Sequence, residues 1–213
     1  MPPRTPKPPK PPKAKESWDI RDPSPQGDLD PKILFEQIGR ALTEWESVEA
    51  RCAELFAVFT LSPSRNPHFA PAIRAYGSVN SYQGRCDMIR AAAAAYFQTR
   101  PKKQKQFEKE VEGVMKDCLL YSNRRNELAH GRVLKFREYT NKRKTKSRDA
   151  GYYTFPSLFN PKKYKLDQTI TYRYMSSDAI HYRQEFTKLH LRLYALRRRL
   201  LSSMHLTWPE TPA

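Results

Sequence analysis

One apolar stripe constrains the fold of this chain more than any other feature of its sequence. Large apolar residues recur there at steps of three and four: Leu34, Ile38, Leu42, Trp45, Val48, Cys52, Leu55 and Phe59. This spacing places them on one face of an α-helix about eight turns long. Asp30 is a good N-cap and Pro31 a good first helical residue, so we predict that the helix begins there.

Three further segments show the same periodicity. The second predicted helix carries Tyr76, Val79, Cys86, Ile89, Ala93 and Tyr96. The third carries Phe107, Val111, Val114 and Cys118, and Gly131 is predicted to end it as a left-handed C-cap residue. The last begins near Ser177 and Asp178 and carries Ile180, Phe186, Leu189, Leu193, Leu196 and Leu200. Four long amphipathic helices predict an all-α fold, an up-and-down bundle of four to five helices.

Residues 133–175 have a different pattern, which predicts a small β-ribbon inserted before the last helix. Alternation is clearest at Ile170, Tyr172 and Tyr174, and a polar loop at 140–151 interrupts the ribbon. Two or three short strands are too few to form a second core, so one helical domain is expected. The predicted organisation is an arm at 1–30, a helical domain at 31–208 with its insertion at about 133–175, and a tail at 209–213.

The predicted arm contains the proline–lysine repeat PPRTPKPPKPPKAK. Proline blocks helices and interior strands, so an extended, mobile segment is expected. The arm could lie along phosphates, present a PxxP ligand to another domain, or be a solvated tail, and composition does not decide among these.

The charge balance indicates a polyanionic partner. The formal net charge is +17, which favours nucleic acid or an anionic membrane surface. No predicted helix shows the exposed apolar face that membrane-surface binding needs, so no membrane partner is expected. The densest basic region, from Arg132 to Arg173, contains twelve lysines or arginines and three acidic residues.

The cysteines indicate a reducing compartment. Cys52, Cys86 and Cys118 each fall on the apolar side of a predicted helix, so they are expected to be buried, reduced thiols. No apolar run approaches the roughly 20 residues of a membrane span, and no signal peptide is apparent. A cytoplasmic protein is expected.

The segment NRRNELAHGR, residues 123–132, contains the residues best suited to chemistry. The guanidinium of Arg125 offers a planar fork of donors to a phosphate, and His130 can transfer a proton near neutral pH. On a straight helix Asn126 and His130 share a face, whereas Arg125 and His130 lie about 140° apart. The pair is therefore predicted to face a groove, with a phosphodiester between the two side chains.

The letters RNELAHG, residues 125–131, resemble the R-N-x-x-x-H signature of HEPN domains, with Arg125, Asn126 and His130 in the signature positions. The resemblance implies a HEPN-like bundle with the motif late in it, and a homodimer whose two motifs share a composite cleft. Many members of that family are metal-independent endoribonucleases of toxin–antitoxin and antiviral defence systems, and others are inactive. The resemblance therefore implies RNA as the substrate, and an antitoxin or a nucleotidyltransferase as a candidate partner.

RNA carries its own nucleophile, so such an enzyme needs to supply only proton transfer and charge stabilisation. His130 would act as general base toward the 2′-hydroxyl or as general acid toward the leaving 5′-oxygen. Arg125 would hold the phosphate, and Asn126 would orient the phosphate or His130. The products would carry 2′,3′-cyclic phosphate and 5′-hydroxyl ends. No cluster with metal-ligand spacing appears in the sequence, so neither a metal nor a cofactor is expected.

The ribbon and the residues that flank the motif form a second candidate site. The expected RNA contacts are Arg124, Arg132, Lys142, Arg143, Lys144, Lys146 and Tyr172. Tyr152, Tyr153, Tyr174, Lys162 and Lys163 belong to the same interleaved pattern. Aromatic rings can stack on bases while cations follow the backbone, but tyrosines are also ordinary strand residues and the charges an ordinary solvated loop.

Other interpretations remain open at this stage. The motif could be an ordinary helix terminus with a glycine cap, and the chain a non-catalytic HEPN-like module that binds RNA or serves as a partner subunit. Two further pairs, Arg183 with His190 and Arg199 with His205, fit the looser R-x4–6-H pattern of the family. We interpret both pairs as solvated helix surface.

Overall fold

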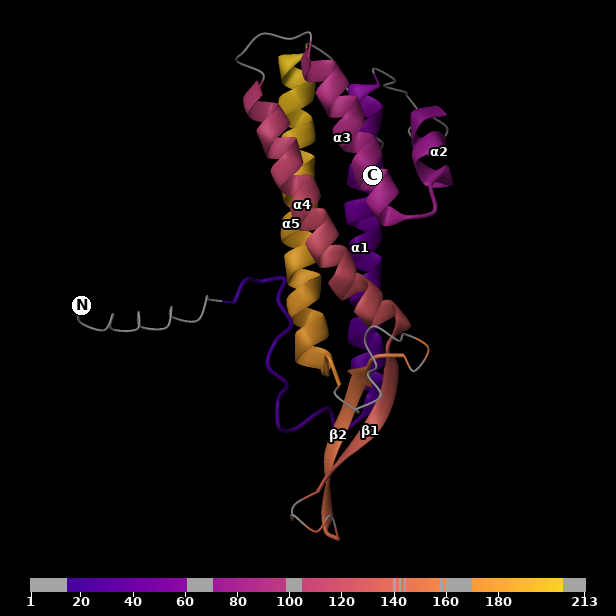
Figure 1. Ribbon diagram of the computed structural model, residues 1–213, viewed down its shortest axis with the longest axis vertical. Helices are drawn as coiled ribbons and strands as arrows, with labels where there is room; N and C mark the ends of the chain where they lie inside the picture. Colours follow the sequence, from indigo (N-terminus) through magenta and orange to yellow (C-terminus); the bar gives the residue numbers. More distant parts are fainter. Residues whose placement is uncertain are drawn as a thin grey trace, which may run out of the picture.

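This computed structural model is a helical bundle with one β-hairpin that projects from its end (Figure 1). The structure describes residues 15–60, 71–98, 105–139, 141, 143, 145–157, 159 and 170–204. The described helices are α1 (Pro31–Phe59), α2 (Pro71–Ser78), α3 (Tyr82–Gln98), α4 (Lys105–His130) and α5 (Ser176–Ser203). The strands β1 (Arg132–Tyr139) and β2 (Ser147–Phe155) lie between α4 and α5. The predicted helical bundle with a β-ribbon before its last helix is confirmed.

The core lies where α1, α3, α4 and α5 pack together (Figure 1). The ring of Trp45 from α1 is fully buried, and its centroid lies 5.1 Å from those of Tyr82 on α3 and Phe186 on α5. The side chain of Asp30 caps α1 by accepting a hydrogen bond from the Lys32 amide at 2.9 Å. The apolar stripe and the cap therefore act as predicted.

The second predicted helix is wrong in one respect, because it consists of two helices, α2 and α3. The chain breaks at residues 79–81, where the Ser81 hydroxyl accepts a hydrogen bond from the Gly84 amide at 3.0 Å and caps the start of α3. The apolar side chains of Tyr76 and Val79 continue the helical spacing into the break, and this continuity conceals it in the sequence.

Helix α4 is continuous and ends at His130, but Gly131 is not a left-handed residue. Among the described glycines only Gly151, which follows the hairpin bulge, has a positive φ, of 91°. At Gly131 the requirement is space, because a Cβ atom there would lie 2.2 Å from Thr154 Cγ2 and 2.7 Å from the Glu127 carbonyl oxygen. The end of α4 thus packs directly on β2.

The hairpin is antiparallel, pairs Arg132 with Phe155, and contains a register shift between Phe136 and Arg137. Strand β2 begins at Ser147, inside the segment predicted to be a loop. The segment 170–174, predicted to be a strand, joins β2 through one bridge between Thr154 and Tyr174. The described part of the ribbon therefore has two strands.

Residues 15–30, which we name the N-terminal strap, pack against the bundle. The ring of Trp18 meets Tyr121 of α4 edge to face, and the Tyr182 hydroxyl of α5 donates to the Asp19 carbonyl oxygen at 3.0 Å. Figure 1 shows the strap in indigo, running beside α5 toward the hairpin. This packing corrects the expectation of a mobile arm up to Asp30. Residues 1–14 of that predicted arm lie outside the described part of the chain.

The three cysteines are buried and free, as predicted. They come from α1, α3 and α4, and the Sγ atoms of Cys52 and Cys118 are 4.0 Å apart. Burial and the neighbouring Cys52 thiol raise the pKa of Cys86 to about 12, so this thiol stays protonated at neutral pH. These residues fill the core. No helix in the described ranges has the length and apolar character needed to cross a bilayer.

Candidate functional site at the end of helix α4

The last turns of α4 divide the motif residues between two faces. Arg124, Glu127 and Leu128 point into the protein and are buried, whereas Asn126 and His130 are exposed. Arg125 lies between these faces, with its side chain 29% exposed. The division follows the helical repeat, as the sequence predicts.

The inward face ends in a buried hydrogen-bonded cluster. Arg124 Nη1 lies 3.0 Å from both the Tyr174 hydroxyl and Glu127 Oε2, and that hydroxyl donates to Glu127 Oε2 at 2.6 Å. The Tyr172 hydroxyl donates to the Glu127 carbonyl oxygen at 3.2 Å. Burial, and to a lesser extent the negative charge of Glu127, raises the pKa of the Tyr172 phenol, so this hydroxyl remains a donor. The cluster ties the end of α4 to the segment before α5.

This cluster corrects one expected RNA contact. The guanidinium of Arg124 is buried and bound by Glu127 and Tyr174, so Arg124 stabilises the fold in this conformation and presents little surface to a ligand. The signal was present in the sequence, because Arg124 and Glu127 are three residues apart on one helical face.

The outward face forms part of a pocket of about 400 Å³, which we name the motif pocket. Helix α4 contributes four lining residues: Asn123, Asn126, Glu127 and His130. The other three follow β2 or precede α5: Ser157, Phe159 and Tyr172. The motif pocket therefore forms only where three separate parts of the chain meet.

Arg125 lies beside the motif pocket without lining it. Its Nη1 atom donates to Asn126 Oδ1 at 3.1 Å, and its Nη2 atom is 3.9 Å from Glu46 Oε1 of α1. Arg125 Nε is buried without a hydrogen-bond partner in the described structure. Asn126 thus connects the guanidinium of Arg125 to the pocket that contains His130.

His130 is the last residue of α4, is exposed, and lines the motif pocket. Its imidazole makes no hydrogen bond or ion pair with any residue in the described ranges. The structure thus brings Asn126 and His130 to one pocket and holds Arg125 next to Asn126.

The expected RNA contacts of the ribbon have different outcomes. Arg132 is half-buried at the start of β1, and Arg143 and Lys146 are exposed near the hairpin tip. Lys142, Lys144, Lys162 and Lys163 lie outside the described residues. Much of the remaining charge on the hairpin is paired: Lys135 and Arg137 with Asp149, and Arg148 with Glu138.

The tyrosines of the ribbon are mostly core residues. Tyr153 and Tyr174 are fully buried and have no free face on which a base could stack. Tyr172 is 5% exposed, and one face of its ring stacks on Tyr174 at a centroid distance of 4.8 Å. Tyr152 is half-buried and lies near Lys135. The structure therefore supports the interpretation of these tyrosines as packing residues, although Tyr172 also lines the motif pocket.

The competing histidine His190 is not solvated helix surface. Arg51 Nε donates to its Nε2 atom at 3.2 Å, and its Nδ1 atom lies 3.4 Å from Glu44 Oε1. It belongs to a polar seam between α1 and α5, far along α5 from the motif pocket. His205 of the other pair lies outside the described residues.

Four lining residues of the motif pocket were not among the predicted site residues: Asn123, Glu127, Ser157 and Phe159. Asn123 precedes Asn126 by three residues and His130 by seven, so helical periodicity could have identified it. Ser157 and Phe159 carry no such signal, because their approach to α4 depends on the path of the chain after β2.

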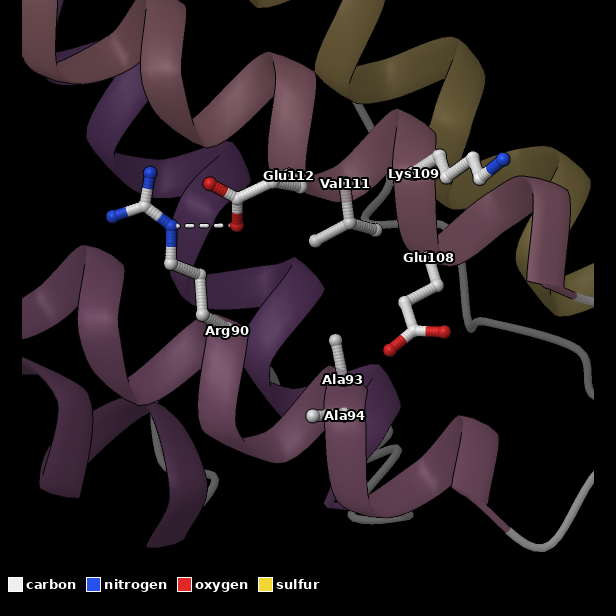
Figure 2. A pocket seen from close by; sticks show the side chains of 7 residues that line it. All are labelled: Arg90, Ala93, Ala94, Glu108, Lys109, Val111 and Glu112. Carbon is white, nitrogen blue, oxygen red and sulfur yellow. Dashed lines mark hydrogen bonds and ion pairs between the residues drawn. The ribbon is translucent and has the colours of Figure 1, made fainter.

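A second pocket, of about 450 Å³, lies between α3 and α4 (Figure 2). Figure 2 shows Ala93, Ala94 and Val111 around it, with the ion pair between Arg90 Nε and Glu112 Oε2, 2.9 Å long, to one side. The run of alanines at 91–95 leaves space between the two helices at this point. Arg90 is already bound by Glu112 and is not free to hold a ligand. We therefore interpret this pocket as a gap beside small side chains.

No group of three or more histidine, cysteine or acidic side chains in the described ranges has a metal-binding arrangement. The chain matches no known protein-family model, no curated protein and no solved structure. The resemblance to HEPN domains therefore rests on the motif letters and on the position of the motif at the end of a late helix in a bundle.

Proposed function

We propose that this chain is a metal-independent endoribonuclease of the HEPN type, which leaves 2′,3′-cyclic phosphate and 5′-hydroxyl ends on RNA. The observation that supports this proposal most is the shared opening of Asn126 and His130 onto the motif pocket, with Arg125 bonded to Asn126. A phosphate-binding cation, an amide and an acid–base group thus lie within about one and a half turns of α4. The net charge of +17 favours a polyanionic substrate.

In the proposed reaction, the 2′-oxygen of a ribose forms a bond to the adjacent phosphorus while the bond from phosphorus to the 5′-oxygen breaks. His130 accepts the 2′-hydroxyl proton or, when protonated, donates a proton to the leaving 5′-oxygen. Arg125 stabilises the charge that develops on the phosphate, and Asn126 orients the phosphate or His130. Water or a second imidazole carries the remaining proton transfer, so no further reactant is needed.

We include a homodimer in this proposal. One motif provides a single imidazole, whereas the reaction has two proton transfers, and a second copy facing the same cleft would supply the other imidazole. A nuclease of this kind needs control, which an antitoxin or a nucleotidyltransferase that covers the motif pocket would provide. The corresponding biological role is that of a toxin or an antiviral defence effector.

One observation favours a second candidate function, a non-catalytic module that binds RNA or serves as a partner subunit. Arg125 does not line the motif pocket, and its nearest acidic neighbour, Glu46, lies 3.9 Å from its Nη2 atom. In such a module the basic surface would hold RNA, and His130 would be dispensable.

The two candidates are separated by incubating the purified protein with single-stranded RNA in EDTA. Because proton transfer by a positioned side chain contributes about 100-fold or more, His130→Ala is expected to lower the cleavage rate by at least that factor. Its thermal unfolding should match the wild type, since His130 is exposed.

The matched control is His190→Ala, which removes the histidine of the competing Arg183–His190 pair and should keep the wild-type rate. Equal cleavage by His130→Ala and the wild type would contradict the assignment. RNA binding without cleavage by the wild type would favour the second candidate.

A further inference from the structure

The motif pocket contains groups that the proposed chemical step does not use. Asn123 adds a second amide beside Asn126, and Phe159 adds an aromatic ring. Of the described residues that line this pocket, none is a lysine or an arginine. The amides and the aromatic ring among these described residues suit the uncharged part of a nucleotide.

The two amides offer complementary hydrogen-bonding groups. Asn126 Oδ1 accepts from Arg125, which leaves the Nδ2 donors of Asn126 for a ligand. Asn123 Nδ2 donates to the Leu119 carbonyl oxygen at 3.3 Å, which leaves its Oδ1 atom as an acceptor. Asn123 and Asn126, three residues apart on α4, thus offer an acceptor and two N–H donors, a combination that matches the polar edge of a nucleobase.

Phe159 supplies the apolar surface that such a base needs. Phe159 is 93% exposed, unlike the aromatic core residues, and it lines the same pocket as the amides. Base–aromatic stacking tolerates any sequence, because every base has a π-face. Asn123 lies seven residues before His130, about 10 Å along the helix axis. This span corresponds to one nucleotide, from its phosphate to the far edge of its base.

We propose that the motif pocket binds the base of a single-stranded nucleotide beside the scissile phosphodiester. In this arrangement Phe159 stacks on the base, and Asn123 and one N–H of Asn126 bind its polar edge. The other N–H of Asn126 stays available to orient the phosphate, and the two amides set the base preference of cleavage. The inference rests on the proposed function for its location next to the cut, but base binding can be measured without cleavage.

The first test measures stacking in a Phe159→Trp, His130→Ala double variant, in which the RNA stays intact. Adding a single-stranded RNA oligonucleotide should quench the tryptophan fluorescence, whereas an abasic oligonucleotide of the same length should not. The His130→Ala protein with Phe159 retained, which keeps Trp18, Trp45 and Trp208, provides the background. Equal quenching by the abasic strand, or none by either strand, would overturn the proposal.

The second test measures base preference with four oligonucleotides that differ only in the nucleotide at the cut. Asn123→Ala should lower the ratio of the fastest to the slowest cleavage rate by about tenfold. Asn80→Ala, which removes an exposed asparagine between α2 and α3, should leave this ratio unchanged. An unchanged ratio in Asn123→Ala, or equal rates on all four substrates with the wild type, would refute base reading. No cleavage by the wild type would refute the proposed function instead, and the stacking test would then decide base binding.

Discussion

At position 131 the missing side chain lets the end of α4 meet strand β2. A Cβ atom at position 131 would clash with Thr154 Cγ2 at 2.2 Å and with the Glu127 carbonyl oxygen at 2.7 Å. One of these neighbours is backbone and the other is a branched side chain, so neither can yield easily. Because His130 precedes this contact directly, Gly131 helps to fix where the imidazole lies.

Gly131→Ala is therefore expected to lower the free energy of unfolding by about 1–3 kcal/mol, through overpacking at the contact between α4 and β2. The measurement is chemical denaturation followed by circular dichroism.

The matched control is Gly113→Ala in the same helix, where a Cβ atom would meet nothing within 4 Å. This substitution should raise stability by about 0.5–1 kcal/mol, because alanine loses less backbone entropy in a helix. Similar effects of the two substitutions would show that the close packing at Gly131 is not real.

At the scale of single residues, the sequence predicted on which helix face a side chain lies better than it predicted which residues that side chain contacts. The spacing of Asn126 and His130 correctly predicted that both lie on the exposed face of α4. It also predicted that Arg125 lies to one side of that face. The contacts of Arg124 could not be predicted in full, because Tyr174 lies 50 residues away in the chain. The prediction that Gly131 is a left-handed cap was wrong for a similar reason. Its close neighbour Thr154 belongs to β2, which is distant in the sequence.

The N-terminal strap joins three elements that the helical pattern does not connect. Asp28 is 8% exposed, and its carboxylate accepts hydrogen bonds from the Ser176 amide at 2.7 Å and from the Ser176 hydroxyl at 2.5 Å. The backbone of Asp28 also bridges to Tyr152 of β2. The strap thereby fixes the start of α5 relative to the hairpin.

Asp28→Ala should lower the free energy of unfolding by about 1–3 kcal/mol, because it leaves the Ser176 amide buried without a partner. Asp22→Ala provides the comparison, since Asp22 is exposed and pairs only with the exposed Lys15 in the described structure. It should change stability by less than about 0.5 kcal/mol. Thermal unfolding of both variants checks the difference. An effect of Asp28→Ala no larger than that of Asp22→Ala would show that the Asp28 hydrogen bonds to Ser176 do not stabilise the fold.

At the scale of elements, the long helices could be predicted because each carries its own apolar stripe and cap. The break at 79–81 was missed because apolar spacing continues into it. The packing of the strap was missed because the proline–lysine repeat dominates the composition of residues 1–30. The two apolar residues that pack, Trp18 and Ile20, have their partners on distant helices. Packing between segments far apart in the chain leaves little trace in local patterns.

At the scale of the whole molecule, the motif pocket lies where α4, the chain after β2 and the segment before α5 converge. The sequence therefore identified Asn126 and His130 on the α4 side of the pocket and could not identify Ser157 or Phe159. The same convergence buries Tyr174, which the sequence had placed in a possible stacking surface. The net charge of +17 remains the property that favours RNA over an uncharged ligand.

In the proposed function, RNA itself provides the nucleophile and the end of α4 transfers the protons. The most direct measurement compares, in EDTA, a single-stranded RNA with the same sequence carrying 2′-O-methyl groups throughout. We expect the RNA to be cut to 2′,3′-cyclic phosphate and 5′-hydroxyl ends and the methylated strand to stay intact. Cleavage of the methylated strand at a comparable rate, or RNA products with 3′-hydroxyl and 5′-phosphate ends, would contradict the proposed function.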